Sequence, residues 1–279
     1  MKRFLKILLL VSLSFSLLGV VDAKSKKKQG CDKGKQNITC PTPAALKKGI
    51  RKCPETGCGL VDPALNRQKN IATSSKTAKN MDFQDLAALP KKVPGYNKIG
   101  DPRQPLVDQG EGKMIRVVAW ALAARKGSKE SCNCRLGKAK DTDNHIVLVD
   151  DPTLKLRAKA TPAKPATDGH KAVPARSAAY NTLKKREAQS QTAEFTPRVR
   201  ITHAKLIGAD LQKLIDANGG KLHVRVTGLQ MYDSEHAVGC HKLLRHTDWE
   251  IHPVFGLEYC PKDKTCTKDS DANWVDLEK

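Results

Sequence analysis

Residues 221–260 constrain the fold most, because they contain two strong strand patterns separated by a polar connection. In residues 222–232 (LHVRVTGLQMY), apolar and polar side chains alternate at the start of the segment. Residues 249–259 (WEIHPVFGLEY) again place large apolar side chains among polar ones. Such alternation is typical of strands with one buried face. The pair therefore predicts a sheet and a mainly β fold.

Further segments supply the remaining elements of this sheet. Residues 114–124 and 145–149 are rich in β-formers and are predicted as strands. Residues 195–201 (FTPRVRI) are expected to return the chain to the sheet. Residues 206–217 have one apolar face and precede an Asn-Gly-Gly stop, which predicts an amphipathic helix.

The order strand, strand, extended return, helix, strand, strand is similar to the oligonucleotide/oligosaccharide-binding (OB) fold. That fold is a five-stranded barrel with its helix between strands three and four. The segments VTGLQMYDSEH and WEIHPVFGLEY also resemble parts of secreted bacterial proteins of unknown function. The resemblance covers residues 110–260 and implies a mainly β fold with one helix (α+β). It carries over no catalytic residue, because such folds host unrelated functions.

The start of the chain has the features of an exported protein. Residues 1–23 combine a basic end, an apolar run and a small-residue cleavage site, which predicts a signal peptide. The apolar run is too short to span a bilayer comfortably, and no transmembrane segment is expected in the mature chain. The protein is therefore expected to be secreted or periplasmic. Residues 24–65 form a basic, cysteine-rich N-terminal region.

Composition divides the rest of the chain into three parts, the second of which contains an insertion. Residues 66–109 contain several prolines and are expected to be a linker or extended arm with a short helix over 81–89. Residues 110–260 are the predicted barrel domain. Within it, residues 152–194 are rich in Lys, Ala, Pro and Thr, which indicates a long, mobile, disordered insertion. Residues 261–279 form a polar tail.

All nine cysteines follow the signal peptide, so disulfides are favoured over metal thiolates. The first four do not form two tight C-x-x-C pairs, and two disulfides are expected to close the N-terminal region. Cys132 and Cys134 are too close to favour a bridge to each other, and Cys240 is one candidate partner. Because the number is odd, at least one cysteine is free, joined to another chain or bound to something else. The disulfide candidates are Cys31, Cys40, Cys53, Cys58, Cys132, Cys134, Cys240, Cys260 and Cys266.

Histidines and acidic residues gather between the last two strands. Imidazole and carboxylate together suit zinc or another first-row metal. The histidine spacing is not that of a zinc-binding helix motif, and Gly239 indicates a loop. A hydrogen-bonded polar hairpin is the favoured alternative to a metal site. The candidate metal ligands are Asp233, His236, His241, His246 and His252.

A second acidic segment, Asp141 to Asn144, directly precedes His145. It lacks the spacing of an EF-hand loop, and a solvated turn is favoured over a cation site. The chain shows no nucleophile elbow for a Ser-His-Asp triad and no phosphate-binding glycine loop. No catalytic residue is named, and no cofactor is expected unless the histidines bind zinc.

The formal net charge of +21 favours acidic partners. Nucleic acid is the less favoured partner, because aromatic residues are few. The favoured interpretation is an exported, non-enzymatic binding or scaffold module. Its ligand would be an anionic envelope polymer, a membrane surface or a partner protein. The alternatives are a metal-dependent hydrolase that uses the His/Asp cluster and an extracellular nucleic-acid-binding protein.

Overall fold

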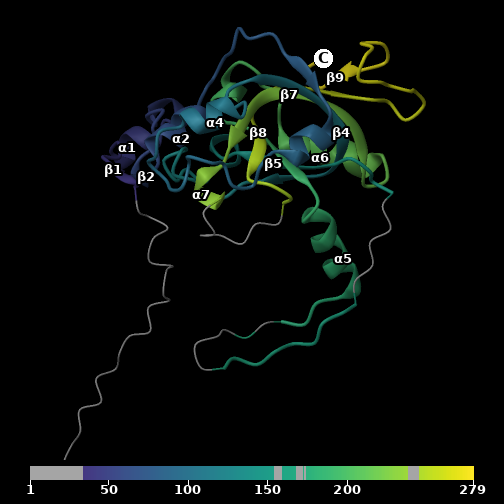
Figure 1. Cartoon of the computed structure of the whole chain (residues 1–279), viewed down its shortest axis with the longest axis horizontal. Helices are drawn as coiled ribbons and strands as arrows, with labels where there is room; N and C mark the ends of the chain where they lie inside the picture. The colour runs from purple at the N-terminus through teal and green to yellow at the C-terminus, as the bar shows by residue number, and fades with distance from the viewer. Residues whose placement is uncertain (1–33, 154–158, 168–171, 173, 238–244) are drawn as a thin grey trace, which may run out of the picture.

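The computed structural model describes residues 34–153, 159–167, 172, 174–237 and 245–279. The predicted signal peptide, Cys31, Cys240 and His241 lie outside the described residues. A closed β-barrel dominates the molecule, and the N-terminal region lies beside it (Figure 1). Among the described residues, no helix combines the length and apolar character that a bilayer crossing requires.

Five strands form the barrel, and their order around it is β4-β5-β6-β8-β7. The strands are β4 (Met114–Lys126), β5 (Asn144–Val149), β6 (Gln191–Phe195), β7 (Leu222–Tyr232) and β8 (Trp249–Tyr259). Antiparallel pairing of β4 with β7 closes the barrel, and β6 pairs with β8 in parallel. The helix α6 (Gly208–Ala217) follows the third barrel strand and precedes the fourth. This is the OB topology, so the predicted OB-like five-stranded barrel is confirmed.

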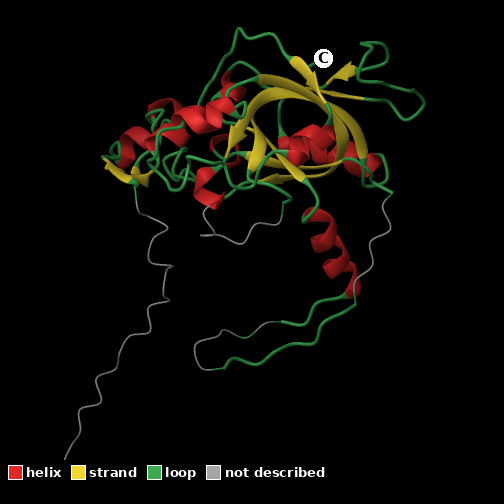
Figure 2. Cartoon of the chain, viewed as in Figure 1, coloured by secondary structure: helices red, strands yellow, loops and turns green. Residues whose placement is uncertain are grey.

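The barrel core is apolar, and α6 lies across one opening of the barrel (Figure 2). Leu211 and Ile215 of this helix are fully buried, as expected for residues four positions apart on one face. Phe195 and Trp249 are the largest fully buried side chains of the core. The core therefore fills the inside of the barrel.

The position of the third strand differs from the expectation. The predicted return at residues 195–201 is wrong, because β6 ends at Phe195 and a 3-10 helix follows at Val199–Ile201. The predicted insertion, 152–194, also includes most of β6 and the helix α5 (Ala178–Glu187). Part of this insertion lies outside the described residues. The segment QTAEF has a polar composition and was therefore not predicted as a strand, although both faces of the strand that it forms are covered.

The N-terminal region has its own small sheet of β1 (Gln36–Ile38) and β2 (Gly59–Val61). Residues 66–109, expected as a linker or arm, contribute ordered elements to the molecule. The strand β3 (Lys79–Met81) pairs with β4 in parallel. Several short helices lie in these parts of the chain, and the one at Phe83–Ala88 corresponds to the helix predicted over 81–89. They are α1 (Pro43–Leu46), α2 (Pro63–Lys69), α3 (Phe83–Ala88) and α4 (Gln104–Asp108).

Short elements also follow the barrel strands. The helix α7 (Ser234–Ala237) begins directly after β7. The strand β9 (Val275–Asp276) lies in the polar tail and pairs with β8. The pairing of β9 with β8 attaches the tail to the barrel.

Three disulfides join the described cysteines: Cys40–Cys58, Cys53–Cys134 and Cys260–Cys266. The first closes the N-terminal region, whereas the second links that region to the loop after β4. Cys132 is buried and has no disulfide partner among the described cysteines. Disulfides of this kind are typical of an oxidising compartment.

Candidate functional site

The outer face of strands β5, β6 and β8 carries a row of ionisable side chains. His145 on β5 pairs in register with Glu194 on β6. On β8, Glu250 and His252 alternate with apolar residues, and Glu250 is opposite Thr192 of β6. The sequence neighbours of these residues belong to the apolar core. They are Ile146, Ala193 and Ile251. Strand alternation therefore places the charged residues on the outer face.

The loop of residues 127–143 covers this face from one side. It connects β4 to β5, the first two barrel strands, and brings Glu130, Cys132 and Asp143 to the site. Asp143 is fully buried. Asn133 fixes it by donating from Nδ2 to Asp143 Oδ2 over 2.5 Å.

The helix α2 and the described residues between β7 and β8 also contribute to the site. These residues, 233–237 and 245–248, supply Asp233 and Arg245. Arg245 pairs with Glu250, and its Nη2 donates to Asp233 Oδ2 over 2.9 Å. Lys69, at the end of α2, lies 3.4 Å from Glu130 Oε2 and 3.8 Å from Asp233 Oδ1. In OB barrels, the face of strands two and three and the loops 1–2 and 4–5 bind ligands. The charged residues occupy the equivalent face and loops.

We call this set of residues the outer-face cluster. Its members are Lys69, Glu130, Cys132, Asp143, His145, Glu194, Asp233, Arg245, Glu250 and His252. The cluster has five carboxylates but only two permanent cations, Lys69 and Arg245. Burying such an excess of negative charge is costly, so protons or a bound cation must compensate for it.

The pKa values of the cluster show how protons respond to this excess. The charge of Glu194 raises the pKa of His145 to about 10, against the lowering effect of burial. Burial raises the pKa of Glu194 to about 7. Burial also raises the pKa of Asp143, and the charge of Glu130 adds to this effect. Burial lowers the pKa of His252, but Glu194 and Glu250 raise it more, and the net change is upward. These four shifts favour a bound proton where a cation could bind instead. Burial also acts to raise the pKa values of Glu130 and Glu250, but their neighbours, led by Lys69 and Arg245 respectively, together lower them more, and the net change of both is downward.

Three groups of side chains within the described residues have potential ligand atoms within 4.8 Å of one another. The first group is Glu130, His145 and Glu194. His145 Nε2 lies 3.3 Å from Glu130 Oε1 and 3.5 Å from Glu194 Oε1. These distances are long for N–H···O hydrogen bonds, which cluster near 2.9–3.0 Å. Ligand atoms about 2.1 Å from one tetrahedral ion lie about 3.4 Å apart. The spacing therefore fits a metal-ligand set.

The second group is Asp143, Glu194 and His252, and all three side chains are buried. His252 Nδ1 lies 3.1 Å from Glu250 Oε1 and 3.1 Å from Glu194 Oε2. His252 Nε2 has no hydrogen-bond partner among the described residues. A carboxylate that holds one imidazole nitrogen leaves the other free to bind a metal, as in many metal sites. Glu250 has this orienting position.

The third group is Glu130, Cys132 and Asp143. The Cys132 sulfur lies 3.7 Å from Glu130 Oε2 and 3.8 Å from Asp143 Oδ2. Burial raises the pKa of the Cys132 thiol well above its ordinary value, and both carboxylates add to this effect. The thiol therefore stays protonated at neutral pH and is a weak nucleophile.

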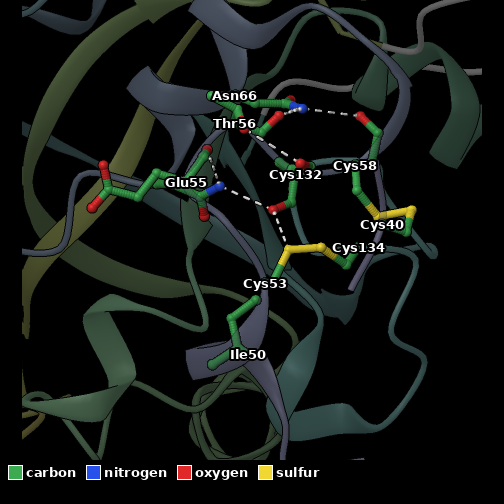
Figure 3. Close-up of a disulfide and its surroundings, with 12 residues drawn as sticks. Cys40, Ile50, Cys53, Glu55, Thr56, Cys58, Asn66, Cys132 and Cys134 are labelled. Atoms are coloured by element: carbon green, nitrogen blue, oxygen red, sulfur yellow. Dashed lines mark hydrogen bonds between the residues drawn. A yellow bond between two sulfur atoms is a disulfide. The ribbon is translucent and has the colours of Figure 1, made fainter. Parts of the chain in front are cut away.

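The N-terminal region fixes the loop that carries part of the cluster (Figure 3). The Cys53–Cys134 disulfide lies beside Cys132 in this view. Asn70 Nδ2 donates to the backbone oxygens of Cys132 over 2.9 Å and of Glu55 over 2.8 Å. These contacts hold the loop of residues 127–143 against the barrel.

A cavity of about 370 Å³ opens at the cluster. Glu130, His145 and Glu194 line it, together with Arg125 and Lys126. Arg125 pairs with Glu187, and Lys126 Nζ donates to the backbone oxygen of Gly137 over 2.7 Å. The lining of the cavity therefore combines the acidic side chains of the cluster with cationic side chains.

The predicted metal ligands have different positions relative to these groups. His252 belongs to the second group, whereas Asp233 pairs with Arg245 and Lys69 and belongs to none of the three. His246 is half-buried and also belongs to none. The side chain of His236 lies outside the described residues, as does His241.

Sequence analysis missed Glu130 and Glu194 and set aside Asp143 and His145. The interpretation of the acidic segment as a solvated turn is wrong, because Thr142 and Asp143 are fully buried. The juxtaposition of Asp143 with His145 was the one local signal for this site. Glu194 could have been found from the alternation in QTAEF, where Phe195 is a core residue.

Comparisons with protein-family models, with curated proteins and with solved structures found no match.

Proposed function

We propose that the outer-face cluster binds a divalent first-row metal ion, with zinc as the first candidate, and that the protein is a metal-dependent hydrolase. The observation that carries the proposal is the buried group of Asp143, Glu194 and His252. Each of these side chains has a polar atom without a hydrogen-bond partner among the described residues. Buried polar atoms of native proteins are nearly always paired, and a metal ion would pair all three.

The chemistry of the donors is consistent with this assignment. Imidazole nitrogen and carboxylate oxygen are ligands for zinc and neighbouring first-row ions, whereas calcium and magnesium prefer oxygen alone. A metal ion in such a site lowers the pKa of a bound water toward neutrality. Arg125 and Lys126 would attract an anionic substrate, and the net charge of +21 acts in the same direction. The proposed substrate class is therefore an anionic ester.

Metal binding and hydrolysis test the proposal together. We expect the dialysed protein to bind zinc or manganese in a calorimetric titration. We also expect it to hydrolyse bis(p-nitrophenyl) phosphate only when it is metal-loaded. His252→Ala should weaken metal binding and abolish hydrolysis, while His246→Ala is the matched control because His246 is outside the three groups. Failure to bind either ion at micromolar concentration, or unchanged binding by His252→Ala, would reject the proposal.

A second proposal retains the non-enzymatic role, in which the protein binds an anionic envelope polymer. A separate cavity of about 720 Å³ supports it, lined by Lys48, Arg51 and Lys140 together with Ile201 and Ile207. Ile201 and Ile207 are 37% and 38% exposed, so the cavity offers apolar surface beside cationic side chains. Binding of an anionic polysaccharide should weaken with salt and should be reduced in Lys48→Ala/Arg51→Ala. His252→Ala should leave it unchanged.

A further inference from the structure

We infer that the outer-face cluster holds two divalent ions bridged by Glu194 and that its substrate is a phosphate ester. This inference rests on the proposed function and adds the number of ions, the bridging residue and the substrate class. The two ligand sets are Glu130 with His145 and Asp143 with His252.

The two oxygens of Glu194 face two different imidazoles. Oε1 lies 3.5 Å from His145 Nε2, whereas Oε2 lies 3.1 Å from His252 Nδ1. Nδ1 is the nitrogen that Glu250 holds, so this contact places Glu194 Oε2 beside the ring of His252 and not at its unpartnered Nε2. The bridging position follows from the membership of Glu194 in both groups of potential ligands. Ions in two-metal hydrolases lie about 3.5–4 Å apart, a distance that one carboxylate spans.

Glu194 connects the two ligand sets, and the third group connects them again through Glu130 and Asp143. Glu130 and His145 form a group with Glu194, and Asp143 and His252 form another group with the same residue. Glu194 is the only residue that these two groups share. One ion would therefore leave either His145 or His252 without a metal partner.

The charge of the cluster also favours two ions. With neutral imidazoles, its five carboxylates exceed Lys69 and Arg245 by three negative charges. One divalent ion leaves this buried set negative. Two divalent ions together with one hydroxide neutralise it completely. Low-dielectric sites strongly favour such compensation.

Unpartnered buried atoms point to the same positions independently of charge. Asp143 Oδ1 and His252 Nε2 have no hydrogen-bond partner among the described residues, and Glu194 Oε2 accepts no hydrogen bond there although it lies 3.1 Å from His252 Nδ1. The exposed fractions of these residues are 0%, 2% and 0%. Asn133 and Glu250 hold the remaining atoms of Asp143 and His252. These two side chains are therefore oriented, and each retains one unpartnered donor atom.

Two bridged ions define the reaction class. Two-metal sites stabilise both the attacking and the leaving oxygen of an in-line displacement at phosphorus. A water held between the ions loses a proton to a cluster carboxylate, and its oxygen forms a bond to phosphorus. The bond from phosphorus to the alcohol oxygen breaks, and the alcohol leaves with that proton. Water is the only co-reactant that this step requires.

The number of ions and their coupling test the inference. The metal-free full chain is titrated with Mn²⁺, and bound metal is measured by elemental analysis and electron paramagnetic resonance. We expect two Mn²⁺ ions per chain and the closely spaced multiline spectrum of an exchange-coupled pair. His145→Ala and His252→Ala should each retain one ion with the spectrum of isolated Mn²⁺. Glu194→Gln should abolish the coupling, and His246→Ala should behave as the wild type.

The outcomes separate this inference from the proposed function. If one ion binds, and it is lost in His252→Ala but retained in His145→Ala, the metal-dependent hydrolase stands and the two-ion inference is overturned. Two ions without exchange coupling also overturn the bridge. No bound metal overturns both proposals. If Glu194→Gln does not fold by circular dichroism, the two histidine variants still decide the number of ions. Hydrolysis of p-nitrophenyl acetate at the same rate as the phosphate diester would reject the substrate class.

Discussion

At the scale of single residues, Glu194 and His145 determine how the cluster responds to protons. Both lie on the outer face of the barrel, and His145 Nε2 is 3.5 Å from Glu194 Oε1. Burial raises the pKa of Glu194 from 4.5 to about 7. The charge of Glu194 raises the pKa of His145 from 6.5 to about 10. In both cases the folded chain holds a proton that the unfolded chain releases at lower pH.

The metal-free protein should therefore lose stability as the pH rises. The stability contributed by His145 is present in full below pH 6.5 and is lost as the pH rises through about 10. Protonated Glu194 adds a loss of stability between pH 4.5 and about 7. Scanning calorimetry of the metal-free chain from pH 5 to about 9 should show a falling Tm. His145→Gln should flatten the upper part of this profile, and an unchanged slope would contradict the assignment.

Bound metal should reverse this dependence, because metal ions and protons compete for the same ligands. The Tm of the zinc-loaded protein should rise between pH 5 and about 7, and addition of a chelator should restore the falling profile. A zinc-loaded profile identical to the metal-free one would contradict metal binding at this cluster.

At the scale of elements, β6 joins the core to the site. Phe195 and Ala193 belong to the apolar core, whereas Thr192 and Glu194 line the cavity on the outer face. Phe195→Ala removes a large, fully buried side chain and should lower the free energy of unfolding by about 3–5 kcal/mol. Thr192→Ala, on the other face of the same strand, should cost much less. Urea unfolding of the two variants measures the difference, and equal losses would contradict the assignment of faces.

The same element shows what could be predicted from sequence. The strands β4, β5, β7 and β8 were predicted because each contains a clear run of β-branched or large apolar side chains. β6 was misplaced because it has only five residues, and two of its outward side chains, Thr192 and Glu194, are polar. Local pattern therefore predicted the barrel, while its shortest strand depended on tertiary pairing.

The cluster could not be predicted from spacing, because its residues come from segments far apart in the chain. Glu130, Asp143, Glu194 and His252 meet only through strand register and loop packing. The histidines that are close together in the sequence favoured a metal site at residues 236–246 instead. Of the predicted metal ligands, His252 is the one that lies in a group of three potential ligands within the described part of the chain.

The loop of residues 127–143 gives a second prediction at the element scale. The Cys53–Cys134 disulfide ties this loop to the N-terminal region, whereas Cys260–Cys266 lies in the tail. The paired change Cys53→Ser/Cys134→Ser should weaken metal binding about 10–100-fold, which is typical for loss of support around a metal site. The control change Cys260→Ser/Cys266→Ser should leave affinity close to wild type. Calorimetric titration compares the two, and equal affinities would show that the loop is held by other contacts.

At the scale of the whole molecule, a strongly basic chain surrounds an acidic cluster. The net charge of +21 contrasts with the excess of carboxylates on the outer face of the barrel. Such a field attracts anionic molecules over several ångströms and is screened by salt. The basic charge would therefore increase the rate at which anionic substrates associate with the protein. The acidic cluster would bind the metal ion and take part in the reaction.

This separation predicts different salt dependence for the two steps. Raising NaCl from about 50 to about 200 mM should raise KM for an anionic substrate strongly while changing kcat little. The same change should alter zinc affinity much less, because the buried cluster is poorly screened. Steady-state kinetics and calorimetry at the two salt concentrations measure both effects. A salt-independent KM would show that the global field does not guide the substrate.

Cys132 gives the molecule a requirement during oxidative folding. Cys132 is two positions before Cys134 in the sequence. When the disulfide of Cys53 forms, both thiols are therefore possible partners. A Cys53–Cys132 linkage would change the loop by two residues and displace Glu130 from the barrel face. Once the loop is correctly seated, the raised pKa of the Cys132 thiol suppresses attack on the adjacent disulfide, because thiol exchange requires thiolate. Correct packing of the loop therefore preserves the Cys53–Cys134 disulfide. A chain with the Cys53–Cys132 disulfide would continue thiol–disulfide exchange until its loop packs against the barrel.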